Sequence, residues 1–305
     1  MKKILVTGGA GFLGRNIASH LSKKGHQVIG CGRGQLNSQQ LAEIGYSAWY
    51  SGSLSSGLLK KINFEPDVII HCAGRGSVEN SIKSSGDDYL DAVQVTELIL
   101  EYMRTRCPRA KFIFPSSPAV IGSTPNRPIS VFMSTNPVSI YGYEKLLAER
   151  LCELYRHNFK MDITIIRLFS VYGIGLRKQL IWDACTKFTE DDKAEFWGNG
   201  NETRDFININ DVVELFHLIL NNNENLLPHK INCGSGCAYK VSDILNTLKN
   251  YFEYKGDIIF NNKIHEGHPR HYWSNNAEAY EYGWNCKVPL AQGLRDYINW
   301  YKLHK

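Results

Sequence analysis

The chain has 305 residues, of which 43% are hydrophobic and 21% are charged, and its formal net charge is +5. This length and composition are typical of a globular protein that buries a substantial core, in one large domain or two of moderate size. The positive charge is spread along the sequence and is not collected in runs of Lys and Arg. We therefore expect no nucleic acid and no membrane surface as partner, but an anionic small molecule as ligand.

The N-terminal sequence argues against export. After Met1-Lys2-Lys3 the apolar stretch reaches Gly8 within a few residues, which is too short for the core of a signal peptide. No later stretch approaches the roughly 20 apolar residues that a membrane helix needs. We therefore expect a cytoplasmic protein.

The eight cysteines are scattered and form no CxxC pair. Cys233 and Cys237 lie nearest to each other, but no second Cys or His pair with matching spacing follows them. We therefore expect buried or surface thiols and no metal site.

In the first half of the chain, short apolar runs rich in β-branched residues alternate with segments of helical period. The predicted strands are Lys3–Thr7, Gln27–Cys31, Ser47–Tyr50, Val68–His71, Lys111–Phe114 and Thr164–Leu168. The predicted helices between them are Phe12–Lys24, Tyr89–Thr105 and Ser139–His157. This alternation predicts an α/β fold, a doubly wound parallel sheet covered by helices, in a dinucleotide-binding domain over residues 1–169.

After Tyr172 the regular alternation stops. Loops rich in Gly and Asn separate helices near Leu180–Thr189, Asp211–Leu220, Val241–Tyr251 and Leu290–Tyr301. We expect residues 170–305 to form mainly a smaller, substrate-binding domain. A short apolar strand near Lys230–Cys233 could return to the main sheet.

The first predicted strand runs into a glycine-rich turn, Thr7-Gly8-Gly9-Ala10-Gly11-Phe12-Leu13-Gly14, which an amphipathic helix follows. Glycine lets the chain turn tightly and lets backbone N–H groups approach a pyrophosphate, whose charge then faces the positive end of the helix dipole. A GxGxxG motif alone is weak evidence for dinucleotide binding. Its position here, directly after a strand and before a helix, makes that evidence specific. The alternative is a glycine-rich turn without a ligand.

The end of the second strand bears on the choice of cofactor. Sites that prefer NAD place a carboxylate about 20 residues beyond the glycine turn. No Asp or Glu occurs between Gly25 and Ala42, and Arg33 stands just after the strand. A guanidinium can bind a 2′-phosphate through paired hydrogen bonds, which favours NADP(H) over NAD(H). The alternative is that Arg33 is a solvated loop residue.

A predicted helix that begins with Tyr141-Gly142-Tyr143-Glu144-Lys145 contains candidate catalytic residues. The i, i+4 spacing puts Tyr141 and Lys145 on one face. A nearby ammonium lowers the pKa of a phenol, so that Tyr141 could exchange a proton with a sugar hydroxyl or carbonyl. Ser117 follows the strand Lys111–Phe114 at the carboxyl edge of the sheet, where it could hydrogen-bond the reacting oxygen. The order of glycine turn, serine and helix is more specific than any one of them.

With these motifs in this order, the sequence resembles the extended short-chain dehydrogenases, which include sugar-nucleotide 4-epimerases, dehydratases and 4-keto reductases. The resemblance covers nearly the whole chain. Further matching segments are His71-Cys72-Ala73-Gly74, Ser116-Ser117, Arg167-Leu168-Phe169-Ser170-Val171-Tyr172-Gly173, Gly198-Asn199-Gly200, Arg204-Asp205-Phe206 and Tyr282-Gly283-Trp284.

The resemblance implies that Ser117, Tyr141 and Lys145 are catalytic, with Tyr141 as the proton donor or acceptor and Lys145 also holding the nicotinamide ribose. The cofactor site that follows from the motifs comprises Gly8, Gly11, Phe12, Leu13, Gly14, Arg33, Ala73, Tyr141 and Lys145. The family also implies a homodimer formed through the helices near Tyr89–Thr105 and Ser139–His157.

A second anion site is implied for the substrate. Arg204 matches the family arginine that grips the pyrophosphate of the nucleotide sugar, and a planar guanidinium suits phosphate oxygens. Arg270 could assist it, or could be an exposed loop charge. Ser170 stands where an asparagine often contacts the substrate phosphates, and Ser117 would contact the sugar.

Departures from the family pattern narrow the choice among the family's reactions. Pro118 and Ala119 occupy the places of the dehydratases' Asp-Glu pair, which argues against 4,6-dehydration. With Arg33, this favours an NADPH-dependent reductase of a 4-keto-6-deoxyhexose nucleotide. The alternatives are a 4-epimerase with bound NAD and a cofactor-binding regulatory protein with a vestigial site. The loop at residues 75–87 is expected to help select the sugar.

Overall fold

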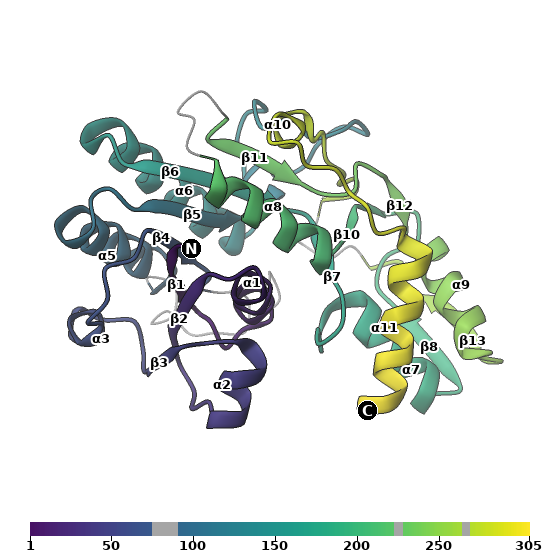
Figure 1. Cartoon of the computed structure of the whole chain (residues 1–305). Coiled ribbons are helices and arrows are strands. Elements are labelled where there is room, and N and C mark those ends of the chain that lie inside the picture. The colour runs from purple at the N-terminus through teal and green to yellow at the C-terminus, as the bar shows by residue number, and fades with distance from the viewer. Residues whose placement is uncertain (75–90, 223–227, 264–268) are drawn as a thin grey trace.

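The computed structural model describes residues 1–74, 91–222, 228–263 and 269–305 (Figure 1). A seven-stranded sheet forms its centre, in the order β11-β6-β5-β4-β1-β2-β3, and its neighbouring strands pair in parallel. The strands are β1 (Lys3–Thr7), β2 (Gln27–Gly32), β3 (Ala48–Ser51), β4 (Val68–His71), β5 (Lys111–Ser116), β6 (Asp162–Leu168) and β11 (Lys230–Cys233). The predicted doubly wound parallel sheet is confirmed.

Helices cover both faces of this sheet because successive strand residues point to opposite sides. Ile4 and Val6 of β1 pack with one set of helices, whereas Leu5 packs with the other. The first set contains α1 (Phe12–Lys23), α2 (Ser38–Ile44) and α8 (Ile209–Asn221). The second set contains α3 (Ser56–Lys61), α5 (Asp91–Arg106) and α6 (Ile140–Phe159). The strand order reverses between β1 and β4, and ligands of such sheets bind beyond the carboxyl ends at this point.

Beside the sheet, the C-terminal part of the chain has a core of its own (Figure 1). Its main elements are α7 (Gln179–Glu190), β8 (Lys193–Phe196), α9 (Val241–Phe252), β13 (Asp257–Phe260) and α11 (Leu290–His304). Between the two parts lie two short strand pairs, β7 (Ser170–Tyr172) with β10 (Phe206–Asn208), and β9 (Thr203–Arg204) with β12 (Tyr239–Lys240). The helix predicted at Asp211–Leu220 is α8, and it packs against α1 of the main sheet.

Two helices on the crossovers from β2 to β3 and from β3 to β4 were not predicted. They are α2 and α3, with 7 and 6 residues, and α2 has no buried residue. A hydrophobic period therefore does not mark them. The capping box of Asn37 with Gln40 begins α2 instead. The helix predicted at 89–105 is described from Asp91 onward as α5, and the loop at 75–87 lies outside the described residues.

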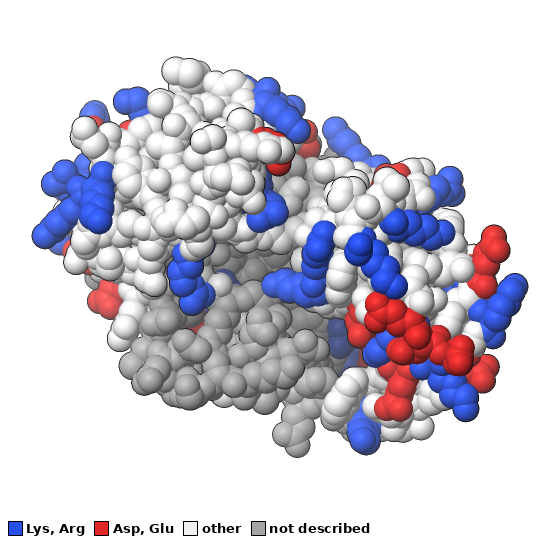
Figure 2. Space-filling model, turned by 90° about the horizontal axis from the view of Figure 1, so that it is seen from below, with Lys and Arg blue, Asp and Glu red and all other residues white. Residues whose placement is uncertain are grey.

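The charged side chains on the surface are dispersed, as the sequence predicted. Figure 2 shows Lys and Arg side chains on both parts of the molecule, with Asp and Glu interspersed among them on one side. Among the described helices, none is both long and apolar enough to span a membrane.

Candidate active site

The glycine turn between β1 and α1 lets three backbone segments come together. Gly8 has a φ of 64°, and a Cβ there would lie 2.6 Å from backbone atoms of Cys72 and Ala73, just after β4. A Cβ on Gly14 would lie 2.6 Å from the carbonyl oxygen of Gly8. Side chains at these two positions would push β1, α1 and the end of β4 apart.

The outer side of the same turn is open. Gly11 is the N-cap of α1 and is exposed, with no side chain capping the helix and no acidic residue in the first turn. The first amides of a helix, here those of Phe12 and Leu13, have no partner inside the helix. Together with the helix dipole they favour an anion. The residues present therefore fit the pyrophosphate of a dinucleotide.

The turn after β2 carries Arg33, whose side chain is exposed. The neighbouring Gly34 is tied to β3, because its carbonyl accepts hydrogen bonds from Trp49 Nε1 at 3.2 Å and Ser51 Oγ at 2.8 Å. The guanidinium thus stands on a fixed turn at the carboxyl edge of the sheet. Its selection of NADP(H) stays a prediction.

Ser117, Tyr141 and Lys145 are brought together where β5 ends and α6 begins. Ser117 directly follows β5, and its hydroxyl lies close enough to the Tyr141 phenol to lower the pKa of that group. Ser139 caps α6 by accepting from the Gly142 amide, which places Tyr141 in the first turn of the helix. Lys145 lies one turn further and donates through Nζ to the Pro115 carbonyl at 2.9 Å. The predicted proximity of the three residues is seen in the structure.

The electrostatics of this group differ from the prediction. Burial raises the pKa of Tyr141, and its contact with Ser117 lowers that pKa only in part. The expectation that Lys145 brings the pKa of this phenol down is wrong for this geometry, because the ammonium faces the Pro115 carbonyl and the Phe114 ring, 4.9 Å from the ring centre. Burial lowers the pKa of Lys145 itself to about 8.

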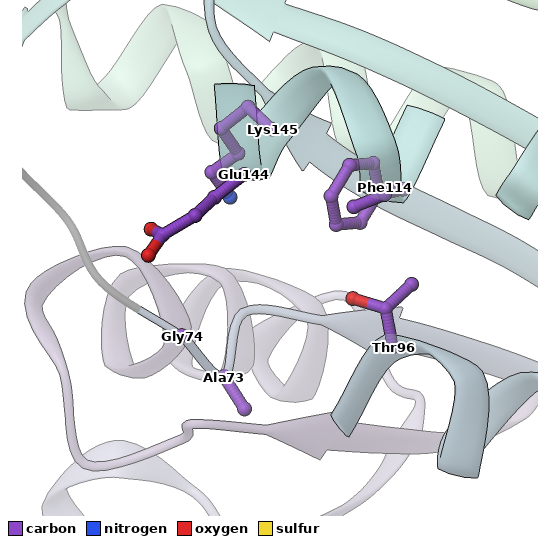
Figure 3. Close-up of a pocket in the computed structure, with 7 residues that line it drawn as sticks. Ala73, Gly74, Thr96, Phe114, Glu144 and Lys145 are labelled. Carbon is purple, nitrogen blue, oxygen red and sulfur yellow. The ribbon is translucent and has the colours of Figure 1, made fainter. Parts of the chain in front are cut away.

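A small pocket lies beside Lys145 (Figure 3). Its lining residues come from the end of β4, from α5, β5 and α6, and are Ala73, Gly74, Thr96, Phe114, Glu144, Lys145 and Ala148. The Glu144 side chain extends from α6 toward the chain at Ala73 and Gly74. Ala73, predicted at the cofactor site, therefore lies across this pocket from Lys145.

Beneath the pocket, His71 joins three elements. Its Nδ1 lies 2.7 Å from Thr7 Oγ1 and its Nε2 lies 3.3 Å from Thr96 Oγ1. Burial lowers the pKa of His71 to about 3, so the ring is neutral. The Thr7 hydroxyl also accepts from the Ala73 amide at 3.3 Å. This chain of contacts fixes the ends of β1 and β4 behind the glycine turn.

A buried ion pair, which sequence reasoning missed, supports Ser117 from below. Arg167 of β6 donates to both carboxylate oxygens of Glu149, at 2.9 and 2.8 Å, and both side chains are 1% exposed. Ser116 donates to the same carboxylate at 2.6 Å. Glu149 lies one turn after Lys145 on α6, so the ion pair joins that helix to β6 and the Ser116 hydrogen bond joins it to the end of β5. The only sequence signal is the i, i+4 spacing of Lys145 and Glu149.

The residues predicted to hold the substrate meet between the two parts of the chain. The Ser170 amide donates to the Asp205 carbonyl at 2.9 Å, and the Thr203 amide donates to the Arg270 carbonyl at 3.0 Å. Arg204 is half-buried and donates to the Thr203 carbonyl at 2.8 Å, whereas the Arg270 side chain is exposed. The backbone therefore gathers Ser170, Arg204 and Arg270, which are far apart in sequence.

Two further residues organise this region: Asp205, for which the matching segment implied no role, and Tyr272, which lies in no predicted motif. The fully buried Asp205 carboxylate accepts hydrogen bonds from the amides of Ser235, Gly236 and Ser274 and from the hydroxyls of Ser235 and Ser274. The Tyr272 hydroxyl donates to the Pro118 carbonyl at 2.6 Å. Tyr272 thus links the segment after Arg270 to the residue next to Ser117.

The fold and this group of residues define the class of protein. A doubly wound sheet with an open glycine turn, and a serine, a tyrosine and a lysine beside it, is the architecture of a nicotinamide-dinucleotide enzyme. The chain belongs to the NAD dependent epimerase/dehydratase family, whose pattern matches residues 4–234. The predicted family and the prediction of a sugar-nucleotide enzyme are confirmed.

Several known proteins are similar over most of the chain. A UDP-glucose 4-epimerase from Mycolicibacterium smegmatis is 27% identical, with 98% of each chain covered. A dTDP-D-glucose 4,6-dehydratase from Dictyostelium discoideum is 30% identical, over 82% of this chain and 62% of its own length. The crystal structure of UDP-glucuronic acid 4-epimerase from Bacillus cereus, in complex with UDP-glucuronic acid and NAD, is 26% identical, with a TM-score of 0.87 and coverage of 99% and 100%.

Proposed function

We propose that this protein is a nucleotide-sugar 4-epimerase that uses NAD. Its similarity to 4-epimerases along the full length, one of them in complex with NAD, supports this reaction. The keto reduction that the sequence favoured becomes the second candidate. Its support was Arg33 as a sign of NADP(H) and the missing Asp-Glu pair, which argues only against dehydration. A single exposed arginine weighs less than relatives that match over nearly the whole chain.

The observation that carries the proposal is the contact of Ser117 with Tyr141 at the carboxyl edge of β5, one helical turn from Lys145. Next to it stand Pro118 and Ala119, which have no acidic or basic group. Among the described residues, the site thus offers Tyr141 for proton transfer and has no Asp-Glu pair directly after Ser117. Inversion at a single carbon through a keto intermediate needs no more than this, whereas loss of water does.

The cofactor would bind along the glycine turn. Gly8, Gly11 and Gly14 with the Phe12 and Leu13 amides would hold its pyrophosphate, while Ala73 and Lys145 would face the nicotinamide ribose. When bound, NAD supplies a reversible hydride acceptor. In this proposal residues 1–169 mainly bind the cofactor and residues 170–305 mainly bind the substrate.

Tyr141 would take the proton from the sugar hydroxyl as that carbon is oxidised and return it on reduction, while Ser117 holds the oxygen in place. Inversion requires the keto sugar to present both faces to the cofactor. The diphosphate must therefore stay anchored while the sugar turns. Arg204, with Ser170 and Arg270, would provide this anchor.

We also propose a homodimer formed through α5 and α6. Tyr143, Leu147 and Leu154 of α6 are 44–50% exposed and lie at helical spacing on one side of the helix. A stripe of this kind suits a helix-to-helix interface. Leu147→Glu should convert the dimer to a monomer in sedimentation analysis, and an unchanged sedimentation coefficient would contradict the interface.

The reaction is tested by identifying the nucleotide released from the purified protein and by supplying UDP-glucose, UDP-glucuronic acid and UDP-N-acetylglucosamine in turn. We expect bound NAD and interconversion of C4 epimers without net NADH formation. Deuterium placed at C4 should remain at C4, because the hydride returns to the same carbon. NADPH oxidation by a nucleotide-linked 4-keto-6-deoxyhexose would identify a reductase instead, and no turnover of any sugar nucleotide would favour a regulatory protein.

A further inference from the structure

Helices α1 and α8 pack against each other on one face of the sheet (Figure 1). They bring three possible metal ligands together. His20 lies in the last turn of α1, and Glu214 and His217 lie one turn apart on α8. One ligand atom from each of the three side chains lies within 4.8 Å of the other two. The group is outside the proposed active site, and the proposed epimerase chemistry does not use it.

The spacing of the first two ligands suits a tetrahedral ion. His20 Nε2 lies 3.5 Å from Glu214 Oε1. Two ligand atoms at zinc bond lengths of about 2.0–2.2 Å, at a tetrahedral angle, are separated by about 3.4 Å. His20 Nε2 is buried and makes no hydrogen bond within the described part of the chain. A ring nitrogen aimed at a carboxylate without a hydrogen bond is suited to share a cation with it.

Burial lowers the pKa of His20 and of His217, which favours the neutral form of each ring. Nδ2 of Asn221 lies 2.8 Å from Nε2 of His217. With this amide turned so that its oxygen accepts from Nε2–H, the contact would orient the ring and leave Nδ1 for the metal, which is the usual support outside the coordination shell.

Lys24 is the natural competitor for the carboxylate. Its Nζ lies 3.5 Å from the same Glu214 Oε1, in a pair that is 42% exposed on both sides. An exposed ion pair contributes little to stability, so a divalent ion could displace the ammonium. His26 also packs near His217, at 5.7 Å between ring centres, but its Nδ1 accepts from the Lys2 amide at 3.2 Å. This places His26 beside the ligand set and not in it.

We propose that His20, Glu214 and His217 bind a divalent transition-metal ion, with Zn²⁺ the best fit, and that water completes the shell. Two imidazoles and one carboxylate are a ligand set that zinc accepts. The ion would cross-link α1, whose other end begins at the glycine turn, to α8. This site differs from the prediction of no metal site, which rested on the cysteine spacing. That spacing bears only on thiolate ligands, and His20 is nearly two hundred residues from Glu214 and His217.

The test uses the full chain after treatment with a chelator, in a Cys237→Ser background that removes the exposed thiol. We expect one equivalent of Zn²⁺ to bind in calorimetry, and Co²⁺ to give a spectrum without thiolate charge-transfer bands. His20→Asn and His217→Gln should each weaken Zn²⁺ binding at least about 10-fold. Lys24→Gln should strengthen it, because the competitor is gone, and His26→Gln is the matched control that should leave it unchanged.

Thermal unfolding gives a second measurement that does not depend on catalysis. Zn²⁺ in large excess over its dissociation constant should raise the Tm of the parent protein by a few degrees and leave the His217→Gln protein unaffected. Binding that survives both His20→Asn and His217→Gln, or that is lost with His26→Gln alone, would overturn the assignment. So would the absence of any Zn²⁺ binding in the Lys24→Gln protein.

Discussion

The two candidate anion sites of this chain bind the anion with different chemical groups. At the glycine turn, backbone amides and the end of α1 would face the cofactor pyrophosphate, and Gly8 and Gly14 allow the close approach of backbone segments. At the other site the charge comes from the Arg204 and Arg270 side chains. The first site is continuous in sequence, whereas the second needs β7, β9 and the segment near Arg270 to come together.

This difference has a physical consequence. A backbone cradle is rigid as soon as the strand and helix around it form, and it suits a ligand part that stays in place. Side-chain cations on a tied loop network can anchor the diphosphate of a ligand that binds and leaves in each turnover. The buried Asp205 carboxylate, through its five hydrogen bonds, holds the frame of that second site. The backbone-built site would suit a tightly held cofactor, and the site built from side chains would suit a substrate that exchanges.

The largest effect should come from the group between the two sites. Tyr141→Phe removes only the phenol oxygen, so turnover should fall about 10²-fold or more while cofactor and UDP affinities change little. Steady-state kinetics and calorimetry measure the two separately. Tyr280→Phe, at an exposed tyrosine outside the proposed site and the proposed dimer interface, is the matched control and should be nearly neutral. Near wild-type turnover in Tyr141→Phe would remove the tyrosine from the chemistry.

Gly8→Ala should damage the backbone-built site alone. The added Cβ would meet the backbone of Cys72 and Ala73 at 2.6 Å, at a φ of 64° that alanine rarely adopts. We expect a loss of about 2 kcal/mol of unfolding free energy together with failure to retain the cofactor. Gly57→Ala, where the nearest atom is 3.8 Å away, serves as the control. Retention of cofactor by Gly8→Ala would show that the turn tolerates a side chain.

Arg204→Ala should weaken UDP binding about 10- to 100-fold, since it removes a half-buried, charge-assisted donor. Arg270→Ala should cost only a few-fold, because its side chain is exposed. Calorimetric titration with UDP would rank the two, and NAD retention should be unchanged in both. Equal effects would mean that both guanidiniums hold the diphosphate, and loss of NAD would mean that the two sites are not separate.

The sequence predicted the site that is continuous along the chain better than the site that distant segments form. The strands around the glycine turn were predicted nearly residue by residue, because apolar β-branched runs and glycine spacing are local signals. The proximity of Ser117, Tyr141 and Lys145 was predictable for the same reason, since a strand end and a helix start lie at one edge of a parallel sheet. The short helices α2 and α3 have no hydrophobic period to reveal them.

What the sequence did not predict depends on contacts between distant segments. Tyr272 reaches Pro118 across 154 residues, and Glu149 meets Arg167 from another element. No local spacing encodes these pairs. The direction of the Tyr141 pKa shift was also missed, because it depends on burial and on where the Lys145 ammonium points, and neither is visible in a Tyr-Lys spacing.

The smallest effect concerns the cation that stands between the two anion sites. Burial lowers the pKa of Lys145 from its ordinary value of 10.5 to about 8 in the folded protein. Between these two pH values the unfolded chain binds more protons at this residue than the folded chain, so unfolding free energy should rise with pH across the window. Below pH 8 and above pH 10.5 the contribution should be flat.

Lys145→Met isolates this contribution, because it keeps an unbranched side chain but does not titrate. The stability of the wild type relative to Lys145→Met should increase as the pH is raised from about 8 to 10.5, by an amount on the order of 1 kcal/mol for each pH unit. Urea unfolding of both proteins across this range measures the difference and cancels the titration of other groups. Parallel curves would mean that the lysine titrates normally in the fold and that its ammonium is not held at a cost to stability.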